Sequence, residues 1–248
     1  MATDSPILIR TAAPLSLPGW FKHLSADDRS DPNWLGANKL RFTYRRILAT
    51  AVAAASPTEY LLFQAKPTLP EPTPSSELTV MTANLWHDWP RQRRLLSRLE
   101  AFAAMVQRER VDVLLLQEVS RTPDLHVDAW LGQQLGMAYV YARANGDEAA
   151  LGFEEGLAVF SRFALTAPRL RQLQPEPLPF VRRLALGVTV RTSWGEIPAF
   201  SVHLALARRQ NAAQLDDLRR WIGDAPAIIG GDFNAHETTP QIQGASRQ

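Results

Sequence analysis

The 248-residue sequence contains no cysteine. Disulfide bonds, thiolate-bound zinc, iron–sulfur clusters and cysteine nucleophiles are therefore excluded. Histidine is also scarce, with five residues, and no two of them stand at the spacing of a helical zinc site. A histidine-rich zinc centre is not expected, and any metal should be a hard cation bound by oxygen ligands.

Lysine is nearly absent, since only three of the 27 Lys and Arg residues are lysine. Arginine suits bidentate contacts with phosphate. A GC-rich genome would produce the same preference, and the formal net charge is only +2. The charge balance therefore permits an anionic substrate without identifying one.

No apolar run reaches the length of a transmembrane helix. The nearest candidate, Ile47 to Ala55, follows two arginines and loosely resembles a twin-arginine secretory signal. It is short, rich in alanine and far from Met1, which favours an ordinary helix. We expect a cytoplasmic protein without a transmembrane segment, with secretion or membrane association as the alternatives.

A proline-rich stretch divides the chain. Residues 66–76 read KPTLPEPTPSS, with four prolines, which predicts a stiff, extended linker. Residues 1–65 are then an N-terminal appendage of unknown role, for which a membrane-associated or partner-binding module is one hypothesis. Residues 77–248 form the main domain.

The main domain mixes strand and helix patterns. Period-3.6 stripes predict helices at 91–110, 128–135 and 207–222. Short apolar runs predict strands at 77–85, 111–116, 137–141, 155–160, 184–190, 197–202 and 227–231, with a polar loop containing Asn145-Gly146 between the third and fourth. Adjacent strand pairs alternate with helices, so the fold class is α/β with a mixed sheet.

Four of the apolar strands run into polar residues that could touch a metal or a phosphate. These are Asn84, Gln117-Glu118, His203 and Asp232-Phe233-Asn234. Each has an ordinary alternative: a loop cap, a strand end meeting water, a core histidine or a Gly-Gly-Asp turn. Together they predict one acidic site at the rim of a packed sheet.

The Asp232-Phe233-Asn234 segment is the most specific of the four. Residues two apart in an extended segment point the same way, so a carboxylate and an amide should face the site side by side. The carboxylate could hold Mg²⁺ or accept a proton, and the amide could donate to a phosphoryl oxygen. The preceding Gly230 and Gly231 would let the backbone approach a ligand closely.

Five segments, in order, carry a family resemblance: MTANLW, LLLQEVS, EEGLAVFSR, SVHLA and GGDFNA. The chain from about Glu77 to Pro240 resembles the endonuclease/exonuclease/phosphatase superfamily, which includes deoxyribonuclease I-like nucleases and neutral sphingomyelinases. The resemblance implies a four-layered α/β/β/α sandwich and Mg²⁺-dependent hydrolysis of phosphoesters, with Mn²⁺ as an alternative cation.

The resemblance also implies roles for single residues. Glu118 resembles the metal-binding glutamate, and Asn84 its partner near the metal and the phosphate. His203 resembles the histidine that contacts the scissile phosphate, and Glu155 the acid that orients this histidine. The other implied roles are phosphate binding by Arg183, with Arg182 as an equal alternative, water activation by Asp232 and transition-state donation by Asn234.

The substrate class stays open between nucleic acid, a phospholipid headgroup and a sugar phosphate. Arg91, Arg93, Arg94 and Arg98 could line a nucleic-acid groove or be a solvated helix face. The aromatic run Trp86, His87 and Trp89 could stack a base, meet a lipid interface or fill a core.

The family pattern also implies a further strand pair and a terminal Ser-Asp-His, which supplies a general-base histidine. No Ser-Asp-His occurs in the sequence, which ends with QIQGASRQ after Pro240. We therefore expect a C-terminally truncated version of a longer enzyme. The alternative to an active phosphodiesterase is an impaired remnant that binds metal or phosphate without turnover.

Overall fold

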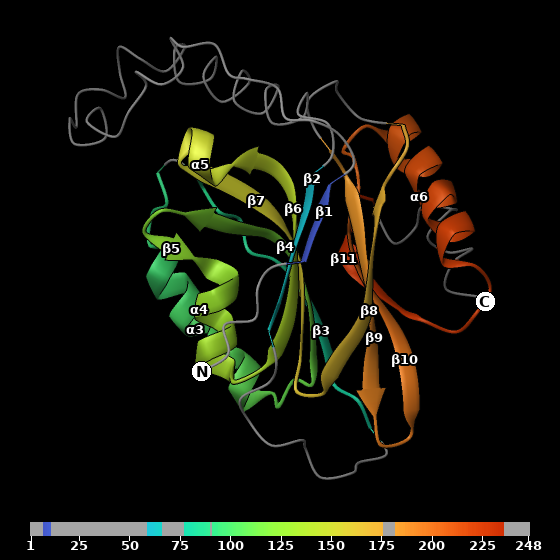
Figure 1. The fold of residues 1–248 in the computed structure, drawn as a ribbon, viewed down its shortest axis with the longest axis horizontal. Coiled ribbons are helices and arrows are strands. Elements are labelled where there is room, and N and C mark those ends of the chain that lie inside the picture. Colours follow the sequence, from blue (N-terminus) through green and yellow to red (C-terminus); the bar gives the residue numbers. More distant parts are fainter. Residues whose placement is uncertain (1–6, 11–58, 66–76, 90, 176–181, 236–248) are drawn as a thin grey trace.

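The computed structural model describes residues 7–10, 59–65, 77–89, 91–175 and 182–235 (Figure 1). Its larger sheet contains β1 (Ile7–Arg10), β2 (Glu59–Ala65), β3 (Val80–Asn84), β4 (Val113–Thr122), β5 (Leu125–His126), β6 (Ala138–Asp147) and β7 (Phe153–Ser161). The smaller sheet contains β8 (Ala164–Gln172), β9 (Leu184–Thr192), β10 (Gly195–His203) and β11 (Ile228–Asp232). The helices are α3 (Leu95–Arg108), α4 (Val127–Leu135), α5 (Glu148–Leu151) and α6 (Arg208–Ile222).

The two sheets pack face to face, with α3 and α4 on the outer face of the larger sheet and α6 on that of the smaller one (Figure 1). The larger sheet has the order β1-β2-β6-β7-β4-β3, with β5 beside β4, and the smaller sheet has the order β11-β10-β9-β8. Parallel and antiparallel pairs occur in both sheets. The predicted α/β class with mixed sheets is therefore confirmed.

Three apolar cores separate the four layers. The buried strand β4 contributes side chains to two of these cores, because its alternate side chains point to opposite faces of the sheet. Leu115 packs between the sheets with Leu186, whereas Leu114 packs beneath the helices with Leu99. The third core joins Phe200 of β10 to α6. The α/β/β/α order predicted from the resemblance is the order that the structure has.

The predicted helices and strands are largely present, with different ends. Helix α3 begins at Leu95 rather than at residue 91, because Arg94 has a left-handed backbone, with φ of 52°. Strand β8 was not predicted, because Pro168 interrupts its pattern. It is an edge strand, and the proline lies where the pairing with β9 shifts register, which is where a strand tolerates proline.

Two strands come from the segment predicted as an appendage. Strand β2 pairs antiparallel with β6, with Leu62 opposite Ala142, and β1 pairs with β2. Part of this segment therefore extends the larger sheet, while the division of the chain into an appendage and a main domain stays a prediction. The expected linker at 66–76 and the alanine-rich run at 47–55 lie outside the described residues. Among the described helices, none is both long and apolar enough to cross a membrane.

Two strands continue where the sequence predicted that they would end. Strand β4 passes through Glu118 to Thr122, because a bulge between Leu116 and Val119 absorbs one register step against β7. Strand β6 likewise continues through the expected Asn145-Gly146 loop to Asp147, with a register shift after Arg143. The predictions were wrong at these ends because register against a distant strand leaves no local sequence signal.

Gly230 and Gly231 serve the packing of the sheets. A Cβ on Gly230 would lie 2.7 Å from Cδ1 of Leu115 in the facing sheet, and one on Gly231 would lie 2.1 Å from the carbonyl oxygen of Val202. The structure thus indicates that these two positions need glycine for the packing of the sheets, whereas the sequence suggested close approach of the backbone to a ligand. They let β11 lie close to β10 and to the larger sheet, which sets Asp232 opposite His203.

We expect Gly231→Ala to lower the free energy of unfolding by about 3 kcal/mol, because its clash is with backbone that cannot rotate away. Gly132→Ala in α4 is the control, since a Cβ there would crowd only the ring of Tyr139, a side chain that can shift; alanine is favoured in a helix, so the change should cost at most about 1 kcal/mol. Urea unfolding of both variants measures the difference. Equal losses would contradict the packing role.

Candidate active site

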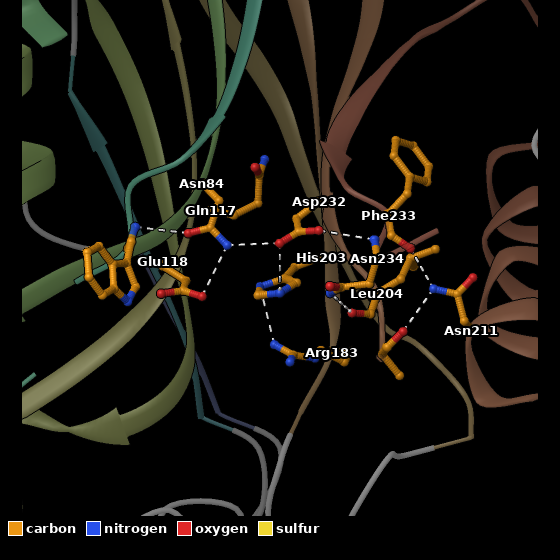
Figure 2. A network of polar contacts seen from close by, with 12 residues as sticks. Asn84, Gln117, Glu118, Arg183, His203, Leu204, Asn211, Asp232, Phe233 and Asn234 are labelled. Atoms are coloured by element: carbon orange, nitrogen blue, oxygen red, sulfur yellow. Dashed lines mark hydrogen bonds and ion pairs between the residues drawn. The ribbon is translucent and has the colours of Figure 1, made fainter. Parts of the chain in front are cut away.

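A row of polar side chains lies where the two sheets meet (Figure 2). Asn84 ends β3 and Glu118 lies on β4, so the larger sheet supplies two of them. His203 and Asp232 end the parallel strands β10 and β11 of the smaller sheet and stand opposite each other. The structure therefore brings together the four residues singled out at the ends of separate strands.

The side-chain amide of Asn84 joins the two sheets. Its Nδ2 donates to Oε1 of Glu118 at 3.1 Å and to Oδ2 of Asp232 at 2.9 Å. The orientation of this amide is determined, because its Oδ1 accepts from the backbone N–H of Trp86 at 2.9 Å. Two carboxylates from different sheets are thus held by one nitrogen atom, and the amide directs a donor rather than an oxygen toward them.

Glu118 reaches the row from a strained backbone. It lies in the bulge of β4 and has φ of 53°, in the left-handed region that a side chain with a Cβ rarely adopts. Such a conformation costs on the order of 1 kcal/mol or more and persists where the surrounding pairing imposes it. The bulge turns this carboxylate toward Asn84 while β4 keeps its pairing with β7 on both sides.

His203 has one tautomer in this site. An arginine side chain only donates hydrogen bonds, and Nη1 of Arg183 lies 3.2 Å from Nδ1 of His203, so Nδ1 is the acceptor. The ring proton is therefore on Nε2, which lies 3.6 Å from Oδ2 of Asp232. Burial of the ring, followed by the charge of Arg183, lowers the pKa of His203 to about 4 against the opposing effect of Asp232. The ring is neutral at neutral pH.

Asp232 and Asn234 are close, but their side chains point in different directions. The backbone N–H of Asn234 donates to Oδ1 of Asp232 at 3.0 Å, while its side-chain Nδ2 donates to the carbonyl oxygen of Leu204 at 2.8 Å. The expected parallel orientation required an extended segment, whereas Asn234 has φ of 46°. One N–H of this amide is engaged by Leu204, and the second has no partner among the described residues. Asn211 of α6 anchors the same loop through Phe233.

Glu155 and the two candidate arginines occupy distinct places. The carboxylate of Glu155 accepts from Nδ2 of Asn145 at 2.6 Å, and the same asparagine binds the backbone N–H of Arg182 at 2.9 Å. The ring of His203 contacts Arg183 and Asp232. The geometry thus places Arg183, rather than Arg182, beside His203. The orienting role of Glu155 stays a prediction.

A buried polar pair behind the row was not predicted. Nε2 of Gln117 donates to Oγ of Ser201 at 3.0 Å, and this hydroxyl donates to the carbonyl oxygen of Leu116 at 2.9 Å. The pair links the sheets next to Glu118 and His203. The sequence shows a glutamine and a serine within apolar strands, which is a weak sign of a buried polar contact. It does not show that the two residues pair, because they are 84 positions apart.

The donor set fits a hard divalent cation. Glu118 and Asp232 offer partly exposed carboxylates, with side-chain exposures of 21% and 28%. Within the described ranges, no group of three or more His, Cys, Asp or Glu side chains forms a metal cage. Mg²⁺ usually takes one or two carboxylates and keeps waters or substrate phosphates as its other ligands, so two carboxylates suffice. Asn84, oriented as a donor, supports these carboxylates and is not itself a ligand in this orientation.

Comparison with known proteins identified one family. The model of the Endonuclease/Exonuclease/phosphatase family matches residues 81–247. A family protein from Leptotrichia buccalis C-1013-b has a TM-score of 0.54 at 17% identity, over 69% of this chain and 72% of that chain. Humanized D. rerio TDP2 has a TM-score of 0.51 at 19% identity, over 68% and 67%.

ANGEL2, described as a 2′,3′-cyclic phosphatase in complex with adenosine-2′,3′-vanadate, has a TM-score of 0.51 at 20% identity, over 68% of this chain and 57% of that one. At these identities the three structures show a shared fold. No curated protein matches the sequence.

We expect the ring of His203 to stay neutral and protonated on Nε2 down to about pH 4 in the metal-free protein. Arg183→Gln should raise the pKa of His203, because a nearby positive charge is lost, and Asp232→Asn should lower it further. Nitrogen NMR of the histidine side chains across a pH titration measures both shifts. A His203 that titrates near 6.5 and ignores Arg183→Gln would contradict this assignment.

The same shift makes stability depend on pH. Because the folded pKa of His203 lies below its unfolded value of about 6.5, the unfolded chain binds more protons as the pH falls from 6.5 toward 4. The free energy of unfolding should therefore decrease across this window, by at most about 1.4 kcal/mol for each pH unit. Above pH 6.5 the ring is neutral in both the folded and the unfolded chain, so no stability is lost there. Urea unfolding at several pH values, with chelator present, should show that the free energy of unfolding of His203→Gln depends less on pH than that of the wild type.

Proposed function

We propose that this chain, which belongs to the endonuclease/exonuclease/phosphatase family, hydrolyses phosphodiesters with the help of a divalent cation. Members of this family are phosphoesterases. The observation that supports the proposal most directly is the Asn84 amide, which holds the carboxylates of Glu118 and Asp232 together from two sheets. A positioned carboxylate pair beside a neutral histidine suits attack of water on an anionic phosphoester.

The cation would be held by Glu118 and Asp232. Both are oxygen donors, and the chain has no cysteine to favour a softer metal. When bound, Mg²⁺ or Mn²⁺ would supply positive charge to a non-bridging phosphoryl oxygen and to the leaving oxygen. Asn84 would keep one oxygen of each carboxylate beside its amide, so that both acids face the cation.

Asp232 would contribute Oδ2, the oxygen that Asn84 holds, to the cation, and its other oxygen, Oδ1, is the proposed proton acceptor for the attacking water. Its Oδ1 is bound by the backbone N–H of Asn234 and its Oδ2 by Asn84, so the carboxylate has one orientation. Attack forms a bond from the water oxygen to phosphorus and passes the water proton to this carboxylate. The bond to the leaving oxygen breaks, and this oxygen departs as an alkoxide that takes a proton from solvent water. The expected Ser-Asp-His histidine has no part in this proposal.

His203 and Arg183 would bind the phosphoryl group. Neutral His203 offers its Nε2–H as a hydrogen-bond donor, and Arg183 supplies the positive charge behind the ring. The second N–H of the Asn234 amide is a further donor for a phosphoryl oxygen. Charge that develops on the equatorial oxygens would then meet donors that need little rearrangement.

Trp86 favours a nucleotide-type phosphodiester among the three substrate classes. The residue is 57% exposed, although its backbone N–H donates to Asn84 and its φ is 46°. The guanidinium of Arg98 lies 5.3 Å from the ring centroid and donates to the carbonyl oxygens of Leu85 and Trp86. A flat ring held rigidly beside the site suits stacking of a base. Trp89 packs instead on Phe153, so it supports no lipid-inserting cluster.

The proposal is tested by hydrolysis of bis-p-nitrophenyl phosphate with and without Mg²⁺ or Mn²⁺. We expect metal-dependent turnover by the wild type, and losses in kcat of about 10²–10⁴-fold for Glu118→Gln and Asp232→Asn. Glu196→Gln is the control for the same chemical change, since that side chain is 60% exposed and forms an ion pair with Arg191 on the surface, away from the row. Wild-type protein that binds Mn²⁺ without turnover would support the impaired-remnant alternative.

The substrate class is tested through Trp86. Loss of one stacked base costs about 1–3 kcal/mol, so Trp86→Ala should weaken binding of a single-stranded oligonucleotide in chelator by roughly 5- to 150-fold. An abasic oligonucleotide should bind both proteins equally. Trp194→Ala is the control, because that ring is also exposed, at 46%, but lies at the β9–β10 turn. If Trp86→Ala instead reduces binding to phosphatidylcholine vesicles alone, the lipid alternative holds.

A further inference from the structure

His87 is a buried histidine beside the carboxylate row. It follows β3 in the chain, and only 6% of its surface is exposed. Its ring packs against Phe153, with ring centroids 4.8 Å apart, and Trp89 stacks on the same phenylalanine at 4.6 Å. Aromatic packing therefore restrains the ring plane of His87 independently of its polar contacts.

Both ring nitrogens of His87 have defined neighbours. The backbone N–H of Trp89 donates to Nδ1 at 2.9 Å, so Nδ1 is an acceptor and a neutral ring carries its proton on Nε2. This Nε2 lies 3.6 Å from Oε2 of Glu118. The ring thus directs a donor at the oxygen of Glu118 that Asn84 does not bind, since Asn84 donates to Oε1.

The same arrangement occurs at the other end of the row. His203 has its Nδ1 beside the donor Arg183, and its Nε2 lies 3.6 Å from a carboxylate oxygen of Asp232. The order along the row is therefore His87, Glu118, Asn84, Asp232 and His203. Each carboxylate therefore lies between the shared amide and the Nε2 atom of a histidine.

We propose that His87 is a positioning residue, whose Nε2–H keeps the Glu118 carboxylate in one orientation for the divalent cation. The inference rests on the proposed function for the cation. Glu118 needs such support because it stands on a strained bulge and its side chain is 21% exposed. Asn84 alone restrains only one of its oxygens. Groups that orient a metal-binding carboxylate are typically worth about 10- to 100-fold in metal affinity or activity.

The test uses His87→Phe, which keeps a ring against Phe153 and loses both nitrogens. We expect the Mn²⁺ concentration for half-maximal hydrolysis, and the Mn²⁺ dissociation constant measured by electron paramagnetic resonance, to rise about 10- to 100-fold. His87→Gln can still present an N–H donor and should recover part of the loss. His126→Phe is the matched control, because His126 contacts Glu148 at 2.9 Å away from the row; it should change neither value.

Nitrogen NMR of the wild-type protein tests the tautomer independently of any variant. In chelator, the neutral form of the His87 ring should carry its proton on Nε2. A proton on Nδ1 would overturn the inference, because no donor would then face Glu118. If His87→Phe does not fold, this measurement and the Mn²⁺ affinity of His87→Gln together test the positioning role of His87.

The outcomes separate this inference from the proposed function. If the wild type binds Mn²⁺ without hydrolysing a phosphodiester, the proposed activity fails, while weaker Mn²⁺ binding by His87→Phe still supports the positioning role. If the wild type hydrolyses but His87→Phe binds Mn²⁺ with unchanged affinity, the positioning role is overturned and the activity stands. Absence of any Mn²⁺ binding by the wild type overturns both.

Discussion

One amide nitrogen, Nδ2 of Asn84, holds the whole site together. It donates to a carboxylate from each sheet, so the two acids are fixed relative to each other only while the sheets stay packed. The groups that donate hydrogen bonds to these carboxylates, the amide of Asn84 and the backbone N–H of Asn234, are neutral and do not balance two negative charges. A bound cation would balance these charges, which is the reason that we propose a metal site at this row.

The rest of the fold supplies the geometry for that interaction. Gly230 lets the smaller sheet approach Leu115, and Gln117 binds Ser201 across the same interface. Left-handed backbone at Glu118 and Asn234 turns the chain at the site itself. Strain of this kind, on the order of 1 kcal/mol or more at each position, persists only where surrounding packing imposes it. Packing of the three apolar cores around the sheets therefore stabilises the strained backbone conformations at these positions.

Four residues of the row, Asn84, Glu118, His203 and Asp232, could be predicted from the sequence as candidates. The place of His87 beside Glu118 and the side-chain orientations could not. Asn84 and His203 end apolar strands, which is a pattern that can be recognised from neighbouring residues alone. The bulge at Glu118 depends on the register between β4 and β7, which no neighbouring residue encodes. The direction of the Asn234 amide depends on a left-handed φ that an extended-strand argument cannot foresee. The pairing of β2 with β6 spans too much chain for any local signal.

The most direct test of the central claim is a crystal structure of the protein with Mn²⁺, recorded at a wavelength that gives anomalous signal from manganese. The account predicts an anomalous peak beside the carboxylates of Glu118 and Asp232, with the Asn84 amide still between them. The peak should disappear in Asp232→Asn crystals grown in the same way. A manganese peak elsewhere in a well-ordered structure, with these two carboxylates free of metal, would contradict the account.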